Sequence, residues 1–120
     1  MFIISSHLFG AQNDQRYEQL KQQAVNLQER SATIISELTT FMQQYQTSTD
    51  HEKLEQQERV KLVEWKEKQQ QINQDFSNLR EDITQSLTTL TQEQQHVLFK
   101  LLSKRQAEVG LISSMLSKFH

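Results

Sequence analysis

The residues of this 120-residue chain that are best suited to metal chemistry are Glu93 and the four histidines. Glu93 and His96 stand three positions apart, a spacing at which a helix can direct a carboxylate and an imidazole toward one metal ion. A carboxylate-bridged di-iron site needs two such pairs, and the sequence holds only this one. The other histidines, His7, His51 and His120, lack the spacing typical of zinc ligands. We therefore expect no metal site.

Nucleophilic and phosphate-binding chemistry find equally little support. The chain has no cysteine, which excludes thiol catalysis and disulfide bonds. Its only two glycines, Gly10 and Gly110, lie a hundred residues apart and cannot form a loop that cradles a phosphate. A narrow helical body also offers no deep pocket for a Ser-His-Asp arrangement. We expect a non-enzymatic protein with no cofactor and no small-molecule substrate.

The most basic stretch lies in the C-terminal third of the chain. Lys100, Lys104 and Arg105 are possible contacts to an anion, and the two lysines stand four residues apart on one side of a helix. Three cations are a small footprint for neutralising nucleic-acid phosphates. A solvated face is the simpler interpretation, so neither nucleic acid nor an anionic membrane surface is the expected partner.

A heptad pattern of apolar residues predicts the elements that carry these side chains. Between Tyr17 and Tyr45 such residues follow one another three and four positions apart, with Ser31 in one polar slot. The same rhythm runs from Leu62 to Ile83, and no proline interrupts it. The sequence therefore predicts an all-α protein. The expected helices span about residues 14–46, 50–88 and 92–118.

Two polar segments predict the turns between these helices. The cluster 46–50 indicates a short turn and an antiparallel, coiled-coil-like hairpin. Folding the hairpin about residue 48 places Ser31 opposite Trp65, a small side chain against a large one. Thr91 and Gln94 have the form of a capping box and favour a break before the third helix. The third helix then closes a three-helix bundle. Alternatively, it continues the second helix as one rod, which would demand an elongated dimeric bundle.

Two apolar regions exceed what the predicted hairpin can bury. Residues 1–13 form a predicted apolar N-terminal arm ahead of a helical bundle domain, residues 14–120. The third helix carries a wider apolar stripe than the first two, and exposed apolar patches usually mark interaction sites. The predicted partner-binding residues are Phe2, Ile3, Phe9, Leu98, Phe99, Leu101, Leu102, Leu111, Met115 and Phe119.

The expected function follows from these two surfaces. We expect a small helical adaptor or chaperone-like protein that binds a partner protein, or a second copy of itself, through amphipathic helix packing. Its first ten residues lack the basic region and cleavage site of a secretory signal, and no apolar stretch is long enough to span a membrane. We therefore expect a soluble, cytoplasmic protein. Two alternatives remain open: a self-assembling structural coiled coil, and a small helical nucleic-acid-associated subunit that uses the basic C-terminal helix.

Overall fold

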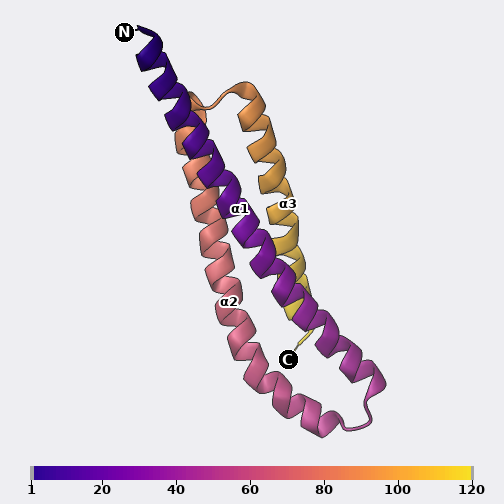
Figure 1. Cartoon of the computed structure of the whole chain (residues 1–120). Coiled ribbons are helices and arrows are strands. Elements are labelled where there is room, and N and C mark those ends of the chain that lie inside the picture. The colour runs from indigo at the N-terminus through magenta and orange to yellow at the C-terminus, as the bar shows by residue number, and fades with distance from the viewer. Residues whose placement is uncertain (1, 120) are drawn as a thin grey trace.

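Three long helices pack into an elongated bundle in the computed structural model, which describes the backbone of residues 2–119 and the side chains of residues 14–119. Each helix runs antiparallel to the one before it (Figure 1). The molecule measures 73 × 20 × 16 Å. In chain order the elements are α1 (Phe2–Thr47), α2 (His51–Ser86), the short 3-10 helix η1 (Leu87–Thr89) and α3 (Gln92–Leu116).

One apolar core runs between the helices and confirms the predicted heptad pattern. Each of the three helices packs against the other two, so the chain forms a closed three-helix bundle rather than a continuous rod. Ser31 is buried at its predicted heptad position in α1. The buried apolar residues are Leu20, Ala24, Leu27, Ile34, Leu38, Phe41, Leu54, Leu62, Trp65, Ile72, Phe76, Leu79, Ile83, Leu90, Leu98, Ile112, Met115 and Leu116.

Side-chain caps define where α2 and α3 begin. The Asp50 carboxylate accepts a hydrogen bond from the Lys53 backbone N–H at 3.1 Å, which satisfies a free donor in the first turn of α2. At the start of α3, the Gln94 N–H donates to Thr91 Oγ1 at 3.1 Å, while the Thr91 N–H donates to Gln94 Oε1 at 3.0 Å. The predicted capping box is therefore confirmed, and it gives α3 an N-terminus of its own.

The first helix is longer than predicted. It begins at Phe2 rather than near residue 14, so the backbone of the predicted arm is helical. Asp14 and Arg16 already contact Gln94 and Ser86 at the end of the bundle, and the preceding turns of α1 extend beyond it (Figure 1). The apolar residues of the predicted arm are not confined to one side of a helix. This pattern indicates that a segment does not lie along a neighbouring helix, and it does not indicate that the segment is non-helical.

The register of the hairpin also differs from the prediction. Trp65 does not lie opposite Ser31: its ring centroid is 5.6 Å from that of Phe41, and its Nε1 donates to Glu37 Oε2 at 3.0 Å. Glu37 and Phe41 lie six and ten positions beyond Ser31, so the pairing of the two helices is displaced by about one heptad. A heptad pattern returns to the same phase after seven residues, and for that reason it did not distinguish the two registers.

Candidate interaction surface

The inner face of α3 is taken up by the core of the bundle. Leu98 is fully buried, and the ring of Phe119 lies 5.5 Å from that of Trp65. Leu98 can meet another protein only when α3 leaves the bundle. The predicted partner-binding residues that point inward are Leu98, Leu101, Leu102, Met115 and Phe119.

The outer face of α3 keeps two large apolar side chains at the surface. Phe99 is 45% exposed and Leu111 is 47% exposed, and both belong to the predicted partner-binding set. Apart from the local turn of α3 itself, nothing lies within 4 Å of the point that a Cβ on Gly110 would occupy, so the surface there is open. This outer face can therefore admit another helix at short range. Around the helix, a stripe of small exposed residues separates the side of Phe99 from the side of Leu111. Its members, spaced three and four residues apart, are Ser103, Ala107, Gly110 and Ser114.

The predicted anion contact is divided by the fold. Lys100 and Lys104 are exposed, and their spacing from Leu111 places all three along one edge of the outer face. Arg105 is only 4% exposed and does not share that surface. The remaining footprint is two lysines, which weakens the case for a nucleic-acid contact.

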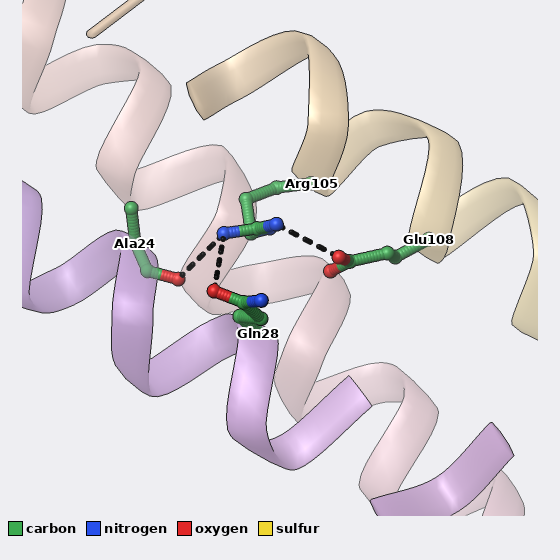
Figure 2. A network of polar contacts seen from close by, with 4 residues as sticks. All are labelled: Ala24, Gln28, Arg105 and Glu108. Atoms are coloured by element: carbon green, nitrogen blue, oxygen red, sulfur yellow. Dashed lines mark hydrogen bonds and ion pairs between the residues drawn. The ribbon is translucent and has the colours of Figure 1, made fainter. Parts of the chain in front are cut away.

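Arg105 instead lies inside the bundle at the centre of the inner face of α3 (Figure 2). Its Nη1 donates to the Ala24 carbonyl oxygen at 3.4 Å and to Gln28 Oε1 at 3.3 Å, and its Nη2 pairs with Glu108 Oε1 at 2.8 Å. Arg105 Nε and Glu108 Oε2 are buried without a hydrogen bond to any described residue. A buried charge is costly unless its hydrogen bonds are made, so this network ties α3 to one place on α1.

A second buried polar contact closes the core beyond the end of α3. Here α1 and α2 continue as a two-helix tip, beside a cavity of about 320 Å³ that Phe119 and Met42 line. The Tyr45 hydroxyl donates to Glu58 Oε2 at 2.7 Å, and Glu58 is buried. Burial and this hydrogen bond raise the pKa of Tyr45 to about 12. The phenol therefore stays protonated and holds the buried carboxylate in place.

Sequence reasoning missed both buried charged residues, although the heptad positions contain a signal for each. Arg105 stands four residues after Leu101 and seven before Ile112, and Glu58 stands four after Leu54. These spacings continue the inward stripe of each helix. A charged residue in such a slot indicates a buried network rather than a surface patch.

The remaining predicted residues include some whose side chains the structure does not describe, and those it does describe form no further site. The side chains of Phe2, Ile3 and Phe9 lie outside the described residues. Glu93 and His96 are exposed, and between residues 14 and 119 no group of three or more potential ligands stands ready for a metal ion. Within the described part of the chain, no helix is long and apolar enough to cross a membrane.

Comparison of the chain with protein-family models, with curated proteins and with solved structures found no match. The functional case therefore rests on the surfaces of the chain itself. Among the described residues of the predicted partner-binding set, Phe99 and Leu111 on the outer face of α3 are the most exposed in the closed bundle.

Proposed function

We propose that the protein is a non-enzymatic interaction module, an adaptor or chaperone-like protein that binds an amphipathic helix of a partner protein along the outer face of α3. The observation that carries this proposal is the pair Phe99 and Leu111, each nearly half exposed on one helix. Large apolar side chains at the surface leave apolar area in water that a partner could bury, and exposed apolar patches often mark interaction sites.

The outer face of α3 is favoured over the other exposed apolar positions by the size of its side chains. The remaining large hydrophobic residues exposed among the described side chains are valines: Val25 on α1, and Val60 and Val63 on α2. Single exposed valines are common on protein surfaces and need no partner. Aromatic side chains contribute most of the binding energy in many interfaces, so Phe99 is the expected anchor.

The small residues between the two anchors define the kind of partner. Ser103, Ala107 and Gly110 leave no bulky side chain in the way, so the backbone of a partner helix can approach α3 closely. Lys100 and Lys104 border the same face and favour acidic residues on the partner. We therefore expect an amphipathic helix with apolar residues on one face and acidic residues along its edge.

The proposal is tested by comparing the binding partners of three forms of the protein in quantitative affinity purification. Phe99→Ser combined with Leu111→Ser removes both anchors, and Val60→Ser is the control because Val60 is 74% exposed on α2. We expect a partner that the double variant loses and the control retains. Urea unfolding of all three proteins verifies that the bundle is intact. Equal binding by all three forms contradicts the proposal.

A further inference from the structure

The connection between α2 and α3 is close to helical geometry. Leu87 has φ −56° and ψ −37°, which are helical values, whereas Leu90 (φ −96°, ψ 146°) and Thr91 (φ −70°, ψ 162°) are extended. Neither glycine nor proline occurs between them, and no described residue has a positive φ. A change of ψ at Leu90 and Thr91 would therefore join α2 and α3 into one helix, about 100 Å long for residues 51–116 at 1.5 Å per residue.

The apolar seam of α2 would continue through such a joined helix. Ile83, Ser86 and Leu90 are buried in the closed bundle and stand three and four residues apart. Val97 and Leu101 follow Leu90 at seven and eleven residues, so they remain in phase with it. Opening the connection would thus produce a long helix with one apolar face, together with an α1–α2 hairpin whose groove is empty.

We propose that α3 exchanges between two copies of this chain, so that α3 of each copy docks on the α1–α2 hairpin of the other. Each copy then supplies the third helix of its partner's bundle, and the contacts that the inner face of α3 makes with α1 and α2 in the closed bundle form again between chains. This inference concerns the inner face of α3 and does not rest on the proposed function, which concerns the outer face.

The surface exchanged is large enough for a stable dimer. The apolar side chains that α3 buries fully are Leu98, Ile112, Met115 and Leu116, and those it buries in part are Leu101, Leu102 and Val109. At roughly 100 Å² for each fully buried side chain and half of that for the others, one α3 contributes about 550 Å². Two exchanged helices and the surfaces that receive them bury about 2,200 Å², a value found in specific dimers and equal to what two closed monomers bury within their own chains.

Arg105 makes the exchange selective for this chain and for one register. The positions seven residues before and after Gln28 on α1 are Lys21 and Ile35, and neither side chain can accept a hydrogen bond. If α3 docked one heptad away along α1, the Arg105 guanidinium would therefore stay buried without a side-chain acceptor in the place of Gln28. In the exchanged dimer, Arg105 of one copy donates to the Ala24 carbonyl oxygen and to Gln28 Oε1 of the other, as it does within the closed bundle.

The closed turn is held by hydrogen bonds that the exchange would replace. Gln95 Nε2 donates to the carbonyl oxygens of Leu87 and Leu90, at 2.9 and 3.2 Å, and the Thr91–Gln94 capping box fixes the start of α3. In a joined helix these backbone groups would pair within the helix instead. Closed and exchanged forms therefore satisfy the same backbone groups, and the capping box is what favours the closed form.

Two substitutions at the connection shift the equilibrium between closed monomer and exchanged dimer in opposite directions. Gln92→Pro places proline at the first position of α3, where the closed form tolerates it and where it holds Thr91 extended, but it would break a joined helix. Thr91→Ala removes the capping side chain. Loss of this cap lowers the equilibrium constant for closing the connection about fivefold in each chain. Because a dimer forms from two chains, its association constant rises roughly 25-fold.

The measurement is multi-angle light scattering on protein that has been refolded from urea at high concentration. We expect a monomer–dimer mixture for the native sequence, more dimer for Thr91→Ala and monomer alone for Gln92→Pro, with equal helix content by circular dichroism. Gly110→Glu blocks the outer face of α3 and should leave the dimer unchanged. Absence of a dimer from both the native sequence and Thr91→Ala overturns the inference, and so does a dimer that survives Gln92→Pro.

Discussion

The α1–α2 seam and the inner face of α3 belong to one core, but they differ in what lies at their centres. Midway along α1, the polar residue buried toward the core is Ser31, which is neutral. At the centre of the inner face of α3 is Arg105, held by Gln28 and Glu108. Away from buried Glu58 at the tip, the neutral centre of the seam gains stability from any good apolar partner, whereas a buried guanidinium gains it only from groups that meet its hydrogen bonds.

This difference assigns separate roles to the two parts of the bundle. The α1–α2 hairpin is a frame whose stability derives mainly from packing. The docking of α3 is selective, because Arg105 carries its Glu108 partner along on α3 but finds the Ala24 carbonyl oxygen and Gln28 Oε1 in only one arrangement with α1. A helix held in this way can leave the groove and return to the same position, as exchange between copies requires.

The largest effect is expected in the seam. Trp65 is 1% exposed and packs beside Phe41 and Phe119, so Trp65→Ala leaves a cavity that these neighbours cannot fill. We expect a loss of about 3–5 kcal/mol in the free energy of unfolding, measured in urea. Val60→Ala, on the exposed side of α2, should change it by less than about 0.5 kcal/mol. A small loss for Trp65→Ala would show that packing at Trp65 contributes little to the frame.

An intermediate effect is expected from the Arg105 network. Glu108→Ala removes the carboxylate that pairs with Arg105 and leaves the guanidinium buried with weaker partners, at a cost of about 2–3 kcal/mol. Arg105→Met combined with Glu108→Ala removes both charges of the pair and keeps an unbranched side chain in the space of Arg105, so we expect stability within about 1 kcal/mol of the native protein. The measurement is again urea unfolding.

The order of these two variants is what decides between the interpretations. If the double variant Arg105→Met/Glu108→Ala is less stable than Glu108→Ala alone, the network contributes net stability. The contrast between a packed seam and a selective inner face would then be wrong.

A smaller effect is expected at the two-helix tip. Tyr45→Phe removes the hydrogen bond to buried Glu58 and should cost roughly 1–2 kcal/mol near neutral pH. Because folding raises the pKa of Tyr45 to about 12 from an ordinary value near 10, its protonated form is the one that the folded state prefers. The contribution is complete below pH 10 and disappears as the pH rises through 12. The stability difference between Tyr45→Phe and the native protein should therefore shrink across that window, and a constant difference would contradict this assignment.

The heptad pattern predicted the helices and their apolar faces, because a face that meets another helix must repeat in phase with it, and it left the closed bundle and the continuous rod as alternatives. It could not give the register of α2, since a displacement of about one heptad that brings Trp65 to Phe41 leaves every apolar residue facing inward. Register here depends on individual contacts such as the Arg30–Asp75 ion pair, at 2.7 Å, which periodicity does not encode.

The candidate site was predicted in part. Phe99 and Leu111 were selected as apolar residues of the third helix, and the structure leaves both exposed. Arg105 was grouped with Lys100 and Lys104 because all three are basic and close in sequence. Neighbouring residues on a helix point about 100° apart, so proximity in sequence did not place them on one surface.

The smallest effect distinguishes the outer face of α3 from its inner face. Gly110 lies within α3 with open space around its missing Cβ, so Gly110→Ala introduces no clash and restores helix propensity. We expect a gain of about 0.5–1 kcal/mol in the free energy of unfolding, and a matching loss for Ala107→Gly on the same exposed face. Urea unfolding at low protein concentration measures both. A loss of stability in Gly110→Ala would mean that another helix already rests against this face in the isolated protein, because only a close neighbour can penalise a single methyl group at an exposed helical position.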